Sequence, residues 1–418
     1  MFRKMVFYTF HLIFKIKILV DYYSLRNNEF KNSDEIIREQ SKKVEKYIES
    51  KKFIYEGDFF NKVKLDKNDI KKINKIIAKP NLKIGRTGGS TGEPLVYYMS
   101  QYNFDLSFAI TYRGWGRAGY KLGDKVAILA GGSLVNQNKT LRSRFTDYIL
   151  NFERYSSYGM DDELMFSYYV DLNKKKPKFM RGYVSSIFEF AKFIDKKELT
   201  LSFDAIMTTA EMLSPYQREY IGKVFSCDVF NTYGLNDGGI SAFECSLHNG
   251  FHIDTERAYL EVLNSQGDVV FDEVGTIVAT SFQNGDGTPF IRYDTGDLGV
   301  VTKSACPCGS PYPLLKELKG RETDALEFNN KVIGSPVLTV LMSRVNVERY
   351  QFFQKSDTDL DIYISPSKDY SNKDEYFIIK SILDNLGEVN VNIKLTSDGI
   401  EFIKTKAGKH KIVIKENT

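Results

Sequence analysis

The 418-residue chain has few cysteines, almost no net charge, and no uninterrupted apolar run long enough to span a bilayer. Four cysteines do not make a disulfide framework in a chain of this length. Together with the lack of a cleavable signal, they lead us to expect a reducing cytoplasm. The 58 basic and 54 acidic residues give a net charge of +4, which is too balanced to favour nucleic acid as the main partner. Length and a 42% hydrophobic content instead predict two or more globular domains.

The N-terminus contains basic residues and no acid. Residues 1–20 contain Arg3, Lys4, Lys15 and Lys17 and no acid, and polar residues interrupt the apolar positions between them. We expect residues 1–30 to form an amphipathic basic segment. It can lie on an anionic membrane surface or pack on the protein's own core with its lysines in water, and we favour packing.

A glycine- and hydroxyl-rich stretch, Arg86–Pro94, contains three glycines and three hydroxyl side chains in nine residues. Such a loop can surround phosphate oxygens with backbone N–H groups and hydroxyls, or it can be a flexible surface loop. It lacks the lysine of a P-loop, because Gly92 is followed by Glu93, and this excludes a P-loop NTPase.

The order of the expected elements predicts an α/β fold. Strand-like and helical stretches alternate from residue 125 to residue 232, which favours parallel strands. From about residue 253, short strands between turn-rich segments indicate a β-barrel-like subdomain. The part after residue 320 has the size and mixture of a small α+β domain, so we expect a large domain over 1–320 and a small domain over 321–418, whose mobility is implied only by the resemblance described below.

Four further stretches contain unusual polar chemistry: 231–237, 292–297, 320–324 and 404–411. A tyrosine such as Tyr233 can stack on a planar base, and acids such as Asp237 and Asp297 suit a hard cation or vicinal sugar hydroxyls. Each stretch has an ordinary alternative when taken alone. Asp237 can be a turn residue, and Lys409 can belong to a solvated basic tail.

Three cysteines and a histidine are spaced for a possible metal site. Cys245 is followed by His248 and His252, and Cys306 and Cys308 follow later with one residue between them. Three cysteines and one histidine would complete a tetrahedral structural zinc shell. The alternative is a set of unrelated reduced thiols.

Taken in order, these motifs resemble the adenylate-forming superfamily, in particular the phenylacetate–CoA ligase-like branch and its CapK group. The narrower resemblance comes from Arg181–Ser186, Thr208–Leu213 and Gln217–Glu219. It implies that ATP and a small carboxylic acid give an acyl-adenylate. The acyl group then passes to coenzyme A, a carrier thiol, or a sugar amine or hydroxyl, in the cytoplasm and in surface-polysaccharide biosynthesis.

The resemblance also implies roles for individual residues. Lys409 would act on the α-phosphate and carboxylate oxygens, and Asp237, glutamate in most relatives, would hold Mg²⁺. Cys245, His252, Cys306 and Cys308 match a pattern that relatives often contain, which favours zinc and prefers His252 to His248. The nucleotide-binding residues would be Thr87, Gly88, Gly89, Ser90, Thr91, Gly92, Ala210, Glu211, Asn231, Thr232, Tyr233, Gly234, Asp297 and Arg321.

Two departures leave an alternative open. Thr323 stands where relatives have a hinge acid, and Glu93 stands where they often have lysine. No acyl pocket can be read with clarity, and Tyr183, Ser185 and Ser186 are our candidates for its wall. A non-catalytic nucleotide-binding scaffold of a membrane-associated polysaccharide assembly is therefore the second hypothesis, although a scaffold has no need to keep Asp237, Asp297, Arg321 and Lys409.

Overall fold

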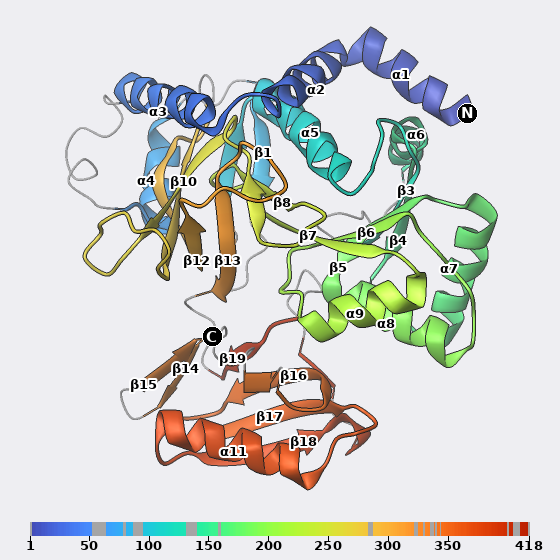
Figure 1. Cartoon of the computed structure of the whole chain (residues 1–418), viewed down its shortest axis with the longest axis vertical. Helices are drawn as coiled ribbons and strands as arrows, with labels where there is room; N and C mark the ends of the chain where they lie inside the picture. The colour runs from blue at the N-terminus through green and yellow to red at the C-terminus, as the bar shows by residue number, and fades with distance from the viewer. Residues whose placement is uncertain are drawn as a thin grey trace.

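The structure, a computed structural model, describes most of the chain. The described residues are 2–51, 64–77, 81–86, 95–130, 140–157, 160–282, 287–321, 325–328, 331–334, 338, 341–342, 344–398, 401–403 and 410–416. Below, residues 2–321 are called the large part and residues 325–416 the C-terminal part (Figure 1).

The N-terminal helices belong to the large part and pack on its core. The helices are α1 (Phe2–Phe14), α2 (Ile16–Asn28), α3 (Ser33–Ser50) and α4 (Lys67–Ile76). Phe7 and Leu19 are buried in the core, and Lys4 and Lys15 form ion pairs with Asp124 and Asp105 at 2.9 and 2.8 Å. Helices α1 and α2 therefore lie on the protein's own core, and Lys4 and Lys15, whose side chains we expected in water, bind acids. In the described part of the chain, every helix is too short or too polar to cross a membrane.

One sheet of eleven strands organises the large part, and the α/β class is confirmed. Its parallel half is β3 (Val126–Ala130), β4 (Phe152–Ser156), β5 (Phe179–Tyr183), β6 (Ala205–Thr209) and β7 (Asp228–Leu235). The helices of this region are α5 (Gln101–Gly116), α6 (Leu141–Leu150), α7 (Asp162–Lys175), α8 (Val184–Lys196) and α9 (Pro215–Phe225). All five residues of β3 are buried, as expected for a parallel strand covered on both faces. Residues of α2 and α5 pack on one face of the sheet, and residues of α7, α8 and α9 pack on the other.

The strands expected as a barrel-like subdomain continue this same sheet. They are β10 (Ala258–Leu263), β11 (Gly275–Ser281), β12 (Phe290–Thr302) and β13 (Leu314–Arg321), and they pair antiparallel. The strands β8 (Ile240–Glu244) and β9 (Phe251–Ile253) come before them in the chain and also pair antiparallel. The order of the whole sheet is β10-β11-β12-β13-β9-β8-β7-β6-β5-β3-β4. Among the described strands the sheet is open, with β10 and β4 at its edges. A hairpin of β1 (Lys83–Arg86) and β2 (Val96–Met99) lies beside it.

The C-terminal part has its own sheet and its own core. Its elements are β14 (Ala325–Phe328), β15 (Lys331–Gly334), β16 (Val347–Gln354), β17 (Asp359–Pro366), α11 (Asn372–Leu386), β18 (Asn390–Leu395) and β19 (Val413–Lys415). A four-stranded sheet, β18-β17-β16-β19, packs on α11 through fully buried residues such as Phe352, Ile362 and Ile378. In Figure 1 this part lies beneath the large part, with β16 directed toward α8 and α9.

Candidate active site

A cleft of about 820 Å³ lies between the large part and the C-terminal part. Its floor is formed by residues that follow β6 and by the end of β7, and its other wall includes residues of β16. Ligands of open α/β sheets bind at the carboxyl ends of the strands, and pockets for small molecules measure roughly 300–1,000 Å³. Both the position and the size of the cleft therefore suit a nucleotide or a similar ligand.

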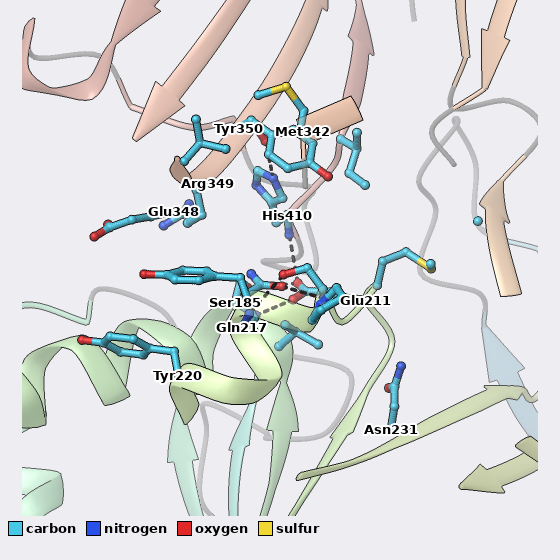
Figure 2. A pocket seen from close by; sticks show the side chains of 18 of the residues that line it. Ser185, Glu211, Gln217, Tyr220, Asn231, Met342, Glu348, Arg349, Tyr350 and His410 are labelled. Carbon is cyan, nitrogen blue, oxygen red and sulfur yellow. Dashed lines mark hydrogen bonds between the residues drawn. The ribbon is translucent and has the colours of Figure 1, made fainter. Parts of the chain in front are cut away.

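Glu211 joins three segments at the centre of the cleft (Figure 2). Its carboxylate accepts hydrogen bonds from the backbone N–H of Ser185 at 2.7 Å and from the Ser185 hydroxyl at 3.0 Å. It also accepts a hydrogen bond from the backbone N–H of His410, in the C-terminal part, at 3.0 Å. Ala210, directly before it, has a φ of 68°, which is a strained backbone for a residue other than glycine and is typical of functional sites.

Tyr233 and Asp297, two residues far apart in the sequence, meet on the same side of the cleft. The Tyr233 hydroxyl donates to the Asp297 carboxylate at 2.9 Å, and both residues are buried. Asn231, two positions earlier on β7, accepts from the Thr208 hydroxyl at 3.0 Å and from the Thr232 N–H at 2.9 Å. A ring edge, a carboxylate and an amide thus line one surface, as recognition of a base and its sugar requires.

Asp237 follows β7 and lies away from this surface. Among the described residues it is not part of the lining of the cleft. Its carboxylate accepts a hydrogen bond from the Tyr293 hydroxyl at 3.3 Å. Burial and the charge of Asp237 raise the pKa of Tyr97, on β2. Asp237 is therefore close to the base of the β1–β2 hairpin, which leads into the glycine loop.

Two of the expected components fall outside the described residues. The glycine loop, Thr87–Gly92, and Lys409 are not described. Arg321 is described through its backbone, which pairs with Asp297 in the register of β12 and β13. His410, the residue after Lys409, reaches the cleft and is held there by Glu211 and by a 2.9 Å hydrogen bond from its Nε2 to the Tyr350 carbonyl.

The expected acyl-pocket wall does not lie in one place. Ser185 lines the cleft beside Glu211, but Tyr183 is fully buried in the core and Ser186 is buried outside the described lining. Tyr183 is the last residue of β5 and packs in the core, whereas Ser185 lies in the first turn of α8 and lines the cleft. Of the three candidates, the structure places Ser185 at the cleft.

Glu244 supports β7 and is not among the site residues predicted from the sequence. Glu244 accepts from the backbone N–H of Asn231 at 2.7 Å and forms a 2.7 Å ion pair with Arg218 of α9. Burial raises the pKa of Glu244, but hydrogen bonds from His248 and Arg218, with the charge of Arg218, outweigh burial and lower the pKa. Glu244 thus stays ionised and fixes the strand on which Tyr233 lies.

Two ion pairs across the cleft are also not predicted from the sequence. Arg349 of β16 pairs with Glu189 of α8 at 2.6 Å, and Glu348 pairs with Lys192 at 2.7 Å. Consecutive strand residues normally point to opposite faces. Here a register shift between Val347 and Arg349 allows both side chains to reach the same helix. No local signal in the sequence connects residues about 160 positions apart.

The three cysteines and the histidine of the expected metal site come together. Their ligand atoms all lie within 4.8 Å of one another, and three of the four residues are buried: Cys245, His252, Cys306 and Cys308 form the cluster. The Cys245 and Cys306 sulfurs are 3.9 Å apart, and the Cys308 sulfur is 3.3 Å from His252 Nε2. His248, the other candidate, instead contacts Glu244 and Arg218.

These distances fit a tetrahedral metal better than a disulfide. Two thiolates bound to one zinc at about 2.3 Å lie about 3.8 Å apart, whereas disulfide sulfurs are about 2.0 Å apart. All four ligands belong to the protein, so the set leaves no open position for a substrate. The donor set therefore fits a structural metal.

No family model matches the chain. Structures of 2-hydroxyisobutyryl-CoA ligase share its fold. The structure of that ligase in the postadenylation state with R3-HIB-AMP has a TM-score of 0.65 at 17% identity, and the alignment covers 84% of this chain and 79% of that one. An open conformation with 2-HIB-AMP and CoA has a TM-score of 0.54, and the thioesterification state has 0.52, at 17% identity and similar coverage. The fold is therefore that of the adenylate-forming CoA ligases.

Sequence comparison is more specific. The chain is 28% identical to protein CapK of Staphylococcus aureus over 396 residues, which cover 90% of this chain and 85% of CapK. It is 27% identical to a phenylacetate–coenzyme A ligase of Thermus thermophilus over 175 residues, 40% of this chain and 39% of that ligase. The chain is thus homologous to CapK over most of its length, and the resemblance read from the motifs is confirmed.

Proposed function

We propose that the chain is an ATP-dependent, adenylate-forming ligase that activates a small carboxylic acid as an acyl-AMP. The observation that carries this proposal is the convergence of Glu211, Tyr233 and Asp297 in one cleft that His410 of the C-terminal part closes. Tyr233 would stack on the adenine, and Asp297 would accept hydrogen bonds from the ribose hydroxyls. Lys409, directly before His410, would engage the reacting oxygens.

The proposed reaction has two steps. A carboxylate oxygen of the acid attacks the α-phosphorus of ATP, and the bond to the β-phosphate breaks, which releases pyrophosphate. The acceptor, a thiol, amine or hydroxyl, then attacks the acyl carbon and loses its proton, and AMP leaves. Negative charge grows on the α-phosphate in the first step, and a fixed cation such as Lys409 lowers its energy.

Asp237 is the residue that would hold Mg²⁺. Its carboxylate offers the hard oxygen ligand that Mg²⁺ prefers, and the Tyr293 hydroxyl orients it. The ion would supply charge neutralisation to the phosphates. Asp237 follows β7, on which Tyr233 lies, so one strand would connect the base and phosphate ends of the nucleotide.

The arrangement of the two parts supports the adenylation step in particular. The same reference ligase aligns better in its postadenylation state than in its open or thioesterification state. We take the higher TM-score of the postadenylation state as support for a similar placement of the two parts here. We infer that the arrangement seen here is the one in which adenylation would occur.

Isothermal titration with ATP and Mg²⁺, followed by pyrophosphate exchange over a panel of carboxylic acids, tests the proposal. We expect nucleotide binding and exchange with at least one acid. Binding without exchange for every acid would favour the scaffold hypothesis instead. Mass spectrometry of a co-purified acyl-adenylate would identify the acid directly.

The acceptor and the biological setting are further parts of the proposal. We place the reaction in surface-polysaccharide biosynthesis, which the resemblance of the motifs implies, and in the cytoplasm. Coenzyme A, a carrier thiol and amino or hydroxyl sugars are therefore the acceptors to compare once an acid is known. Contact of residues 1–20 with a membrane stays a prediction, and co-sedimentation with anionic vesicles tests it.

We also propose that Cys245, His252, Cys306 and Cys308 bind a structural zinc ion. The proposal is supported by the 4.8 Å cluster of their ligand atoms and by the engagement of His248 elsewhere. A zinc here would connect the turn before β13 to β9 and to the end of β8, next to Glu244. Metal analysis of the purified protein should find about one zinc per chain.

A further inference from the structure

Arg257, directly before β10, is a buried cation. Its side chain is 2% exposed. Among the described residues no carboxylate pairs with it, its Nη2 contacts only the sulfur of Met99 at 4.0 Å, and its Nε has no hydrogen-bond partner. A buried charge without an opposite charge is costly, and a buried polar group without a partner requires an explanation.

Arg113, another buried arginine, is compensated by carboxylates in the usual way. Arg113 of α5 is 1% exposed and forms two hydrogen bonds to Glu256, at 2.7 and 2.9 Å, with further contacts to Asp254 and Tyr312. Glu256 is adjacent to Arg257 in the sequence but binds Arg113. Asp254 and Glu256 thus neutralise Arg113, whereas Arg257, one residue further on, has no carboxylate partner among the described residues.

The surroundings of Arg257 connect it to the proposed site. Met99 and Tyr97 lie on β2, and the Tyr97 ring covers Gly85 on β1, so closely that a Cβ at position 85 would lie 2.1 Å from the Tyr97 ring. The two strands lead into the glycine- and hydroxyl-rich stretch. Burial and the charge of Asp237 raise the pKa of Tyr97, and the charge of Arg257 acts in the opposite direction. Tyr97 is therefore near both the acid proposed to hold Mg²⁺ and the unpaired arginine.

We propose that Arg257 binds an oxyanion of a ligand at this corner of the proposed active site. A guanidinium presents a planar fork of donors that matches the two oxygens of a carboxylate or phosphate group. The oxyanion comes either from the pyrophosphate end of ATP or from a carboxylate of the acid substrate. The identity of the ligand rests on the proposed function, whereas the need for an anion rests on the burial of Arg257 alone.

The test compares the wild type with Arg257→Met, Arg257→Lys and the control Arg113→Met. Thermal unfolding without ligand comes first. The Arg257→Met melting temperature should equal or exceed that of the wild type, because an apolar side chain replaces a buried charge that has no protein partner. Arg113→Met should melt lower, since it leaves buried carboxylates unpaired.

Titrations with pyrophosphate, MgATP, AMP and succinate then identify the oxyanion. If it is a phosphate, Arg257→Met weakens pyrophosphate and MgATP binding by about tenfold or more, as expected for lost hydrogen bonds to a charged group, and leaves AMP unchanged. If it is a carboxylate, only succinate binding falls. Arg257→Lys should retain part of the affinity, because it keeps the charge and loses the fork.

Two results would overturn the proposal. One is equal binding of all four ligands by the wild type and Arg257→Met. The other is a lower melting temperature for ligand-free Arg257→Met with unchanged anion binding, which would show that Arg257 pairs within the protein. Failure of AMP and MgATP to bind the wild type would instead count against the proposed function, and the pyrophosphate and succinate titrations would still decide on Arg257.

Discussion

Reversing the charge of Arg349 should open the cleft between the large part and the C-terminal part. Arg349 pairs with Glu189 at 2.6 Å and lies next to Glu348, which pairs with Lys192 at 2.7 Å. Arg349→Glu would replace one attraction by a repulsion and would place a second acid beside Glu348. Repulsion between β16 and α8 would then favour separation of the C-terminal part from the large part.

The size of the effect follows from the exposure of these side chains. The Arg349 and Glu189 side chains are 12% and 33% exposed, so the pair lies between a surface and a buried ion pair. An exposed pair contributes about 0.2–1 kcal/mol. Loss of the pair and the new repulsion together should destabilise the closed arrangement by about 2 kcal/mol relative to the open one. The ratio of closed to open molecules would then fall about thirtyfold.

Amide hydrogen exchange at His410 measures this shift. The His410 N–H donates to Glu211 across the cleft at 3.0 Å, so its protection reports closure directly. Exchange should be at least about tenfold faster in Arg349→Glu and should recover in the double variant Glu189→Arg/Arg349→Glu. Lys178→Glu is the matched control, because it makes the same charge change at an exposed 3.7 Å pair within the large part.

The double variant is the decisive comparison. If it exchanges as fast as Arg349→Glu alone, the two side chains do not act as a pair. If Arg349→Glu exchanges at the wild-type rate, the ion pairs do not hold the cleft closed. Either outcome would refute the reasoning from geometry.

Three further outcomes are expected. Lys409→Ala should lower carboxylate-dependent pyrophosphate exchange by about 10²–10³-fold and leave nucleotide binding largely intact, whereas unchanged exchange would exclude the proposed role. Cys306→Ser should lose bound zinc and melt at a lower temperature, and Cys227→Ser, outside the cluster, should keep the metal. Burial raises the pKa of Glu256, but the charge and hydrogen bonds of Arg113 lower it from 4.5 to about 2. The stabilisation from this pairing is therefore present above pH 4.5 and lost as the pH falls toward 2, and acid unfolding of Glu256→Gln should lack this component.

Local patterns in the sequence predict the elements near the site well. The stretch 215–225 predicts a helix, and α9 has these bounds, because Ser214 and Gln217 form a capping box and Pro215 suits the first turn. The Cys and His spacing likewise predicts a cluster that the structure assembles from β8, β9 and the turn before β13. A helix cap can be predicted because its residues are close together in the sequence. A metal site can be predicted because few residue types bind a metal ion.

Long-range contacts could not be predicted in the same way. The pairing of Arg349 with Glu189 and the hydrogen bond from His410 to Glu211 depend on how two separately folded cores meet. We expected a barrel-like subdomain, but the strands continue the large sheet. Short strands separated by turns have the same sequence pattern in a barrel and in antiparallel strands that extend a sheet. The register that joins β13 to β9 is set by pairing across about 60 residues.

Glu211 forms hydrogen bonds with both the large part and the C-terminal part, which its expected place in an adenine pocket does not imply. A residue that only shaped an adenine pocket would need bonds within the large part, which Ser185 already provides. Its third bond, from His410, attaches to the same peptide unit that begins at Lys409. One carboxylate thus connects the floor of the cleft to the chain segment that contains the proposed catalytic lysine. A nucleotide that orders Glu211 would therefore also favour the closed position of the C-terminal part, so that ATP binding and delivery of Lys409 become a single coupled event.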